Sequence, residues 1–303
     1  MSGLAGCASA SPGEALFETT PPKLESAVTP ETLAAEMPEP ILISDGYKMI
    51  WNDEFDGLDG NAPDEKKWAF QEGTGTEYGL TQWGNNEAQY YLPKNASVKD
   101  GRLFITAKKE SHEGMAYTSA RLFTQPTFSF QYGRVEARIQ LTGVPGLWPA
   151  FWLLPLPESG GNNGAYGTWA ASGEMDIMEN RGRMMSETSG AAHYGGAWPN
   201  NVFSGETYHF PENESAEDFH VYALEWRETE LKWFVDDNLF FTLTDWYTTG
   251  ADGSAISKPA PFDKPFYILL NCAVGGQFDG GVTPPETFEQ ADMIVDYVRV
   301  FQK

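Results

Sequence analysis

Apolar and polar residues alternate in short runs along most of this 303-residue chain. Residues 103–107, 133–139 and 231–235 each place an apolar side chain at every second position, which is the spacing of a strand with one buried face. Residues such as 99–101 and 235–238 supply the Asp, Gly and Asn that turns favour. No long amphipathic helical pattern is visible. The pattern predicts an all-β sandwich of two antiparallel sheets, with its final strand over 294–301.

The first 40 residues have a different texture. They are rich in Ala, Glu, Pro, Ser and Thr and show no sustained alternation, which is typical of a flexible tether. Residues 4–7 read Leu-Ala-Gly-Cys and resemble a bacterial lipobox, although the charged and apolar regions that normally precede it are missing. We therefore expect a truncated lipoprotein signal and tether over 1–40, a folded domain over 41–303, and membrane attachment through a lipidated Cys7.

Three carboxylates lie within six residues at 174–179, in the sequence Glu-Met-Asp-Ile-Met-Glu. On a strand, Glu174 and Asp176 share one face while Met175 and Ile177 share the other. Strict alternation would bury Glu179 in the core without a partner, which is costly. One extra residue, a β-bulge at 177–178, would return Glu179 to the face of the other two acids. The sequence therefore predicts a row of three acids with Asp176 in the middle.

This row suits glycoside hydrolysis with retention, which needs two carboxyl groups roughly 5 Å apart. A third acid between them would raise the proton affinity of its neighbours, so that one glutamate stays protonated and acts as the acid. Two alternatives remain on spacing alone: a solvated acidic strand face, and a site for a hard cation built from these acids.

Charge and aromatic content narrow the class of ligand. The formal net charge of −23, from 43 acidic and 20 basic residues, disfavours nucleic acid, anionic lipid and strongly anionic substrates. A neutral polymer fits best. Trp148 and Trp152 lie four residues apart on one predicted strand face, where indole rings can stack on sugar rings. Trp83, Trp169 and Trp198 lie in Gly- and Asn-rich loops, whereas we expect Phe151, Trp226 and Trp233 in the core, with Cys272 as a buried free thiol.

At this point the chain resembles glycoside hydrolase family 16, specifically its laminarinase-like β-1,3-glucanases, over residues 51–301. The stretches that carry the resemblance are 51–55, 83–87, 117–121, 146–152, 172–182, 193–196, 218–220 and 296–300. The resemblance implies a β-jelly roll with an open concave substrate cleft. It also implies that Glu174 is the nucleophile, that Glu179 is the acid/base, and that Asp176 orients and tunes the pair.

The same resemblance assigns the surrounding groups. It implies that the sugar contacts are Asn86, Arg121, Trp148, Trp152 and Trp169, and that His193 lies near the cleaved bond. Laminarinases commonly carry Asn-Trp after Ala-Val-Gly-Gly, whereas this chain has Gln277-Phe278, a difference that could shift the cleavage preference. The glycine-rich segment 160–164 predicts a mobile cleft edge.

The leading hypothesis is a retaining endo-β-1,3-glucanase acting on laminarin-like polymers, without a catalytic cofactor. Alternatives are a mixed-linkage β-glucanase, an algal galactan hydrolase, a non-catalytic β-glucan-recognition protein and an acidic surface adhesin. We expect a monomer located outside the cytoplasm, either secreted or held at the cell surface or outer membrane. The resemblance further implies a structural calcium ion, bound by the backbone carbonyls of Glu54 and Gly101 and the side chain of Asp296.

Overall fold

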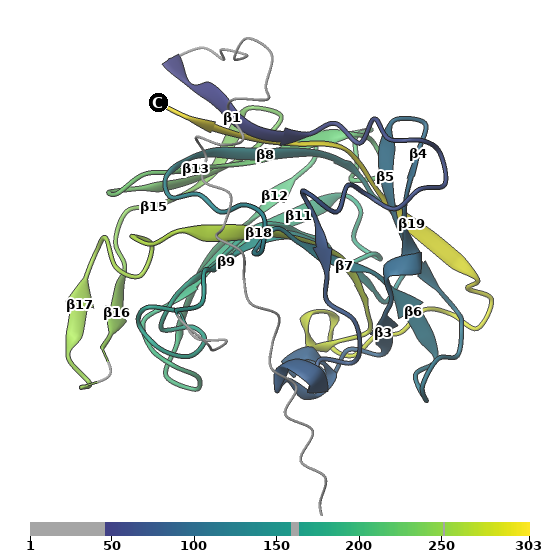
Figure 1. Ribbon diagram of the computed structural model, residues 1–303, viewed down its shortest axis with the longest axis horizontal. Helices are drawn as coiled ribbons and strands as arrows, with labels where there is room; N and C mark the ends of the chain where they lie inside the picture. The colour runs from purple at the N-terminus through teal and green to yellow at the C-terminus, as the bar shows by residue number, and fades with distance from the viewer. Residues whose placement is uncertain (1–45, 159–163, 251) are drawn as a thin grey trace, which may run out of the picture.

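The computed structural model describes residues 46–158, 164–250 and 252–303, and these form two stacked β-sheets (Figure 1). Both sheets curve in the same direction, as expected of a jelly roll. The predicted all-β sandwich is confirmed. The lipobox, the tether and nearly all of the predicted mobile segment 160–164 lie outside the described residues. Within those residues, no helix has the length and apolar character to cross a bilayer.

The larger sheet has ten strands. Along its main path the strands are β15 (Asn238–Leu243), β14 (Leu231–Val235), β13 (His220–Trp226), β8 (Gly133–Gln140), β19 (Gln290–Gln302), β5 (Arg102–Lys108), β6 (Tyr117–Ser119) and β3 (Gln89–Tyr91). Two further strands lie off this path, β1 (Lys48–Asp53) beside β19 and β4 (Ala96–Lys99) beside β5. The pairs are antiparallel except β3 with β6, which run parallel. The final strand is longer than the predicted 294–301.

The smaller sheet carries the acidic row. Its seven strands are, in order, β12 (Val202–His209), β11 (Glu187–Tyr194), β10 (Glu174–Glu179), β9 (Leu147–Pro155), β18 (Phe266–Val274), β7 (Arg121–Phe123) and β2 (Ala69–Phe70). A separate hairpin consists of β16 (Tyr247–Thr249) and β17 (Ala255–Ser257). The short 3₁₀ helices are η2 (Thr76–Tyr78), η3 (Thr81–Gly84), η4 (Pro93–Asn95) and η5 (Gln277–Asp279).

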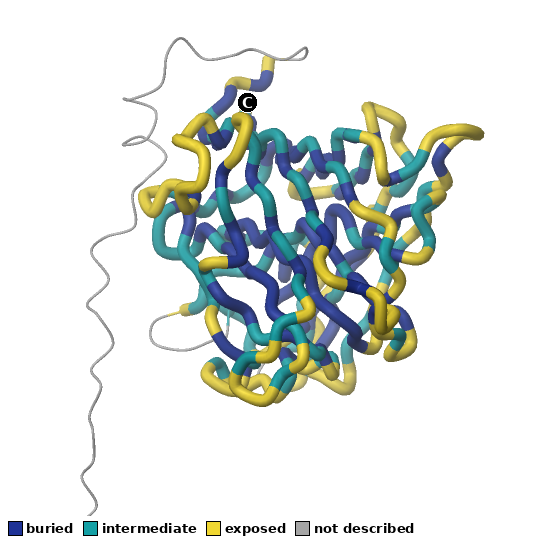
Figure 2. Tube along the Cα trace, turned by 90° about the vertical axis from the view of Figure 1, so that its right-hand side faces the viewer, coloured by how far each residue is buried: buried dark blue, intermediate teal, exposed yellow. Residues whose placement is uncertain are grey.

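The core lies between the two sheets, where the buried residues follow the strands (Figure 2). Strand β18 is buried along its whole length, including the free thiol of Cys272, because it lies in the middle of the smaller sheet. Phe151, Trp226 and Trp233 are fully buried, as predicted. Trp83 is buried as well, so among the loop tryptophans only Trp169 and Trp198 keep large exposed surfaces.

Candidate active site

The predicted β-bulge in β10 is present. Asp176 lies opposite Trp152 of β9, and the next β9 residue, Phe151, lies opposite Met178, so β10 contains one extra residue. The pairing with β11 shifts at the same place. Ile177 and Met178 are both buried, and the carboxylates on either side of them remain on the opposite face. Avoiding a carboxylate in the core therefore explains the irregular register.

Core contacts hold the bulge in place. The indole Nε1 of Trp233 in β14 donates a hydrogen bond of 2.8 Å to the backbone carbonyl of Asp176. The hydroxyl groups of Thr188 and Ser189 donate to the carbonyl of Glu179, at 3.1 and 3.3 Å. These bonds satisfy carbonyls that the shifted register would leave without partners. Strand β10 is thereby fixed at both ends of its irregular segment.

An indole N–H holds each outer glutamate. Trp148 Nε1 donates to Glu179 Oε1 at 2.8 Å, and Trp169 Nε1 donates to Glu174 Oε2 at 2.9 Å. Each hydrogen bond uses one oxygen of the carboxyl group and leaves the second oxygen available to react with a substrate. Neither arrangement could be read from the sequence, which predicted sugar contacts for both tryptophans.

His193 completes the cluster from β11, directly opposite Glu174. Its Nε2 lies 3.4 Å from Asp176 Oδ2 and 3.9 Å from Glu174 Oε1. Asp176 is only 4% exposed, and its Oδ2 has no hydrogen-bond partner. The imidazole therefore lies beside the unpaired Oδ2 of Asp176.

Burial dominates the electrostatics of the row. It raises the pKa of Asp176 to about 8. Burial, followed by the charge of Asp176, also raises the pKa values of Glu174 and Glu179 to about 8. The indole hydrogen bonds oppose this shift, because they favour the ionised carboxylates. The site can therefore hold a protonated carboxyl group near neutral pH, as a general acid requires.

The remaining predicted sugar contacts occupy different environments. Trp152 is part-buried, and its Nε1 donates to Asn271 Oδ1 at 2.7 Å. Arg121 is 7% exposed, with its guanidinium between the rings of Trp83 and Trp152 at 4.6 and 4.7 Å. Arg121 therefore packs against the ring of Trp152. Asn86 is exposed in a left-handed conformation. The carbonyl of its neighbour Asn85 accepts a hydrogen bond of 2.8 Å from the backbone N–H of Gln277, so this loop lies beside the 275–278 segment.

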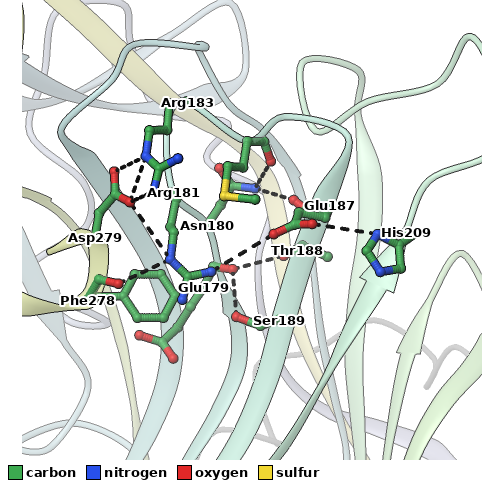
Figure 3. A network of polar contacts seen from close by, with 11 residues as sticks. Glu179, Asn180, Arg181, Arg183, Glu187, Thr188, Ser189, His209, Phe278 and Asp279 are labelled. Atoms are coloured by element: carbon green, nitrogen blue, oxygen red, sulfur yellow. Dashed lines mark hydrogen bonds and ion pairs between the residues drawn. The ribbon is translucent and has the colours of Figure 1, made fainter. Parts of the chain in front are cut away.

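Gln277 and Phe278 begin a short helix near Trp148, the residue that holds Glu179. The ring of Phe278 stacks on Trp148 with centroids 5.0 Å apart and an interplanar angle of 18°. The guanidinium of Arg181 lies 4.2 Å from the Phe278 centroid, and its Nε donates to the Phe278 carbonyl (Figure 3). Asp279 is ion-paired with Arg183 at 2.7 Å. Phe278 therefore packs against the indole that holds Glu179.

A buried polar cluster that the sequence pattern does not reveal lies next to the site. Glu87 is 3% exposed and accepts hydrogen bonds from Gln89, Tyr91 and Asn85. Burial raises its pKa. Glu87 belongs to the stretch 83–87 that carried the resemblance, and that stretch was the signal available in the sequence. The same Tyr91 hydroxyl accepts a hydrogen bond from Asn271. Asn271 also accepts the indole N–H of Trp152, so it links this cluster to Trp152.

Arginine side chains occupy the predicted calcium ligand Asp296. Asp296 lies where β19 bulges against β8, and its two carboxyl oxygens are paired with Arg102 at 3.2 Å and Arg138 at 2.7 Å. A calcium ion would have to displace both guanidinium groups. Among the described residues, the acidic and imidazole groups close enough to share a metal ion are Glu174, Asp176 and His193, whose ligand atoms lie within 4.8 Å of one another.

Comparison with known proteins agrees with this geometry. The sequence pattern of "Glycosyl hydrolases family 16" matches residues 84–298. Glucan endo-1,3-beta-glucosidase A1 of Niallia circulans is 42% identical over 272 residues, which cover 85% of this chain and 38% of that protein. Beta-glucanase of Rhodothermus marinus is 40% identical over 266 residues, covering 84% of this chain and 85% of that protein. The X-ray structure of endo-β-1,3-glucanase from Pyrococcus furiosus superposes with a TM-score of 0.72 at 35% identity, covering 88% of this chain and 98% of that one.

Proposed function

This chain belongs to family 16 of the glycosyl hydrolases, and from that premise we propose that it is a retaining, endo-acting hydrolase of β-1,3-glucan. The observation that carries the proposal is the bulged strand β10, which brings Glu174, Asp176 and Glu179 to one face. The names of the relatives support β-1,3-glucan as the substrate. The match covers only 38% of the Niallia circulans enzyme, and the proposal does not extend to functions of the rest of that protein.

Glu174 is the nucleophile. Its Oε2 accepts the indole N–H of Trp169, and Oε1 is free to attack the anomeric carbon. The hydrogen bond stabilises the negative charge that attack requires. The glycosyl–enzyme ester forms as the bond to the departing sugar breaks, and water then hydrolyses the ester in a second displacement. Two inversions at the same carbon retain the anomeric configuration.

Glu179 supplies and recovers the proton. Its Oε1 accepts from Trp148, so Oε2 carries the proton that passes to the departing glycosidic oxygen. In the second step the same carboxylate takes a proton from the attacking water. The raised pKa makes the protonated form available near neutral pH. Between the two glutamates, a protonated Asp176 donates to Glu174 and keeps the nucleophile aimed, which gives its otherwise unpaired Oδ2 a partner.

The test is an NMR time course of the first product formed from a β-1,3-linked gluco-oligosaccharide. Retention of the anomeric configuration is expected, and an inverted first product would overturn the double displacement. Laminarin, mixed-linkage glucan, agarose and carrageenan run in parallel discriminate the substrate. Failure to cleave any of them, with glucan binding intact, would favour a recognition protein. The presence of all three acids in one row weighs against that alternative.

The assignments can be separated chemically. Glu179→Ala should still be glycosylated by a substrate with an activated aryl leaving group, because such a group needs little protonation. Glu174→Ala should not, but azide should replace the missing nucleophile and give the inverted product. Loss of either glutamate alone should remove most turnover, because nucleophile and acid act as a unit. In Glu179→Ala, azide can instead attack the glycosyl–enzyme ester and give the retained product. Azide products of the same anomeric configuration from both variants would contradict these roles.

Three finer proposals accompany this one. Residues 41–303 form the catalytic domain of a monomer, and the enzyme works outside the cytoplasm, either secreted or attached through a lipidated Cys7. A calcium ion near Glu54, Gly101 and Asp296 stays a prediction that the arginine pairs of Asp296 oppose. Added calcium should leave the melting temperature of chelator-treated protein unchanged if those pairs hold, and should raise it if the ion binds.

A further inference from the structure

An exposed aromatic side chain continues the cleft face beyond the catalytic row. Phe203, in edge strand β12, lies directly opposite His193 of β11, and His193 lies directly opposite Glu174 of β10. Directly opposed residues of antiparallel strands share a face. With neighbouring strands about 4.8 Å apart, the backbone of Phe203 lies about 10 Å from that of the nucleophile, across the sheet.

Phe203 keeps most of its side chain exposed. It is 61% exposed, which makes it one of the most exposed large apolar residues in the described part of the chain. Its ring centroid lies 5.2 Å from that of His193, and the His193 centroid lies 5.4 Å from that of Trp169. Trp169 in turn holds Glu174. A continuous aromatic surface therefore leads from the nucleophile to the sheet edge.

Small residues keep this surface flat. A Cβ atom on Gly205 would lie 2.9 Å from Phe203 Cζ and 3.1 Å from the Cβ of Ala191, so the phenyl ring lies close over the bare backbone. A larger residue at position 205 would lift the ring. Further along the same face, Thr207 is exposed opposite Ser189 and offers a hydroxyl at the rim. A flat apolar ring beside a polar rim matches a pyranose, whose ring face is apolar and whose edge carries hydroxyl groups.

Continuity with the active site identifies the occupant. The strand order is β12-β11-β10-β9-β18-β7, so Trp152 and Arg121 lie on one side of the catalytic strand and Phe203 lies on the other. A polymer that crosses the strands and contacts Trp152 would reach β12 on leaving β10. We propose that Phe203 forms an additional subsite that stacks on a glucose unit of the same β-1,3-glucan chain. This inference rests on the proposed function.

The test compares Phe203→Ala with Leu239→Ala. Leu239 is also an exposed apolar residue, 50% exposed on β15 of the other sheet. We would measure kcat and KM on reducing-end-labelled β-1,3-gluco-oligosaccharides of increasing length. Phe203→Ala should lose about 3- to 10-fold in kcat/KM on long chains, mainly through KM, because one aromatic contact is removed. The shortest cleaved substrates should be unaffected, and the labelled products should show a shifted cleavage position. Phe203→Trp should restore the long-chain preference.

Three results would overturn the subsite: equal losses on short and long chains, no loss on long chains, or the same loss in Leu239→Ala. Phe203→Thr, which suits an edge strand, replaces the alanine variant if the latter does not fold. Calorimetric binding of the same oligosaccharides to Glu174→Gln, with and without Phe203→Ala, measures the contact without turnover. A wild-type protein that fails to cleave β-1,3-glucan would refute the proposed function, whereas unchanged binding on loss of Phe203 would refute the subsite alone.

Discussion

The indole of Trp148 provides a direct test of the acid/base assignment. Its Nε1 donates a hydrogen bond of 2.8 Å to Glu179 Oε1. Burial raises the pKa of that carboxyl group, and this hydrogen bond lowers it. Trp148→Phe removes the donor and leaves a ring that can still stack on Phe278. A hydrogen bond to a charged group contributes about 1.5–3 kcal/mol, and one pKa unit corresponds to about 1.4 kcal/mol. Because Trp148 is only part-buried, we expect the pKa of Glu179 to rise by about one unit.

The pH dependence of kcat/KM reports this change. Glu179 must be protonated to deliver a proton, so its ionisation sets the alkaline limb of the profile. Loss of the hydrogen bond should move that limb to higher pH by about one unit, even if the overall rate falls through weaker sugar binding. Profiles would be measured on a β-1,3-gluco-oligosaccharide within the pH range where both proteins remain folded.

Trp152→Phe is the matched control. Trp152 lies on the same strand and the same face, but its Nε1 donates to the neutral amide of Asn271. Its replacement should lower affinity without moving the alkaline limb. A limb that stays fixed in Trp148→Phe, moves to lower pH, or moves equally in both variants would refute the reasoning. With an activated aryl substrate, which needs little protonation, the shift between wild type and Trp148→Phe should shrink.

Burial raises the pKa of Asp176 above its unfolded value, so the folded protein retains the proton longer and loses stability as pH rises from about 4 to about 8. Asp176→Asn should therefore raise the melting temperature by a few degrees at pH 8 and by much less at pH 4; an equal gain at both would contradict this origin. Gly190→Ala would place a Cβ 2.5 Å from Cδ1 of Trp233 and should cost about 1–3 kcal/mol in urea unfolding, whereas Gly57→Ala, with only ordinary contacts, should cost little. Full-length precursor expressed in bacteria should partition with membranes, and its Cys7→Ala form should not; equal solubility of the two forms would rule out lipid attachment.

Local pattern and desolvation cost were sufficient to predict the elements around the site. Alternation predicts β14 with the bounds that the structure has. The sequence 266–274, which is apolar except for Asn271 and Tyr267, coincides with the fully buried β18. The bulge at 177–178 followed from one physical argument, that a lone carboxylate does not enter a core. The bulge fixes which residues share a face, so the row of three acids was predictable before any contact was known.

The partners of these residues were not predictable in the same way. Trp148 and Trp152 lie on the same strand face, so the sequence pattern does not separate their roles. The indole of Trp148 donates a hydrogen bond to Glu179, whereas that of Trp152 donates to Asn271 of β18. Arg121 looked like a polar cleft residue, but it is buried between two rings. Contacts of this kind depend on strand order and join residues from 31 to 119 positions apart, which a one-dimensional pattern does not contain.

The choice of indoles as the donors has a chemical reason. Within the described residues, no Lys or Arg lies within ion-pair distance of Glu174, Asp176 or Glu179, and His193 is the nearest titratable base. A guanidinium in the position of Trp148 would orient Glu179 equally well, but its full charge would lower the pKa of the carboxyl and remove the acid. A neutral N–H fixes the direction of the carboxyl with a smaller effect on its ionisation. The site therefore uses donors strong enough to aim the glutamates and weak enough to leave one of them protonated.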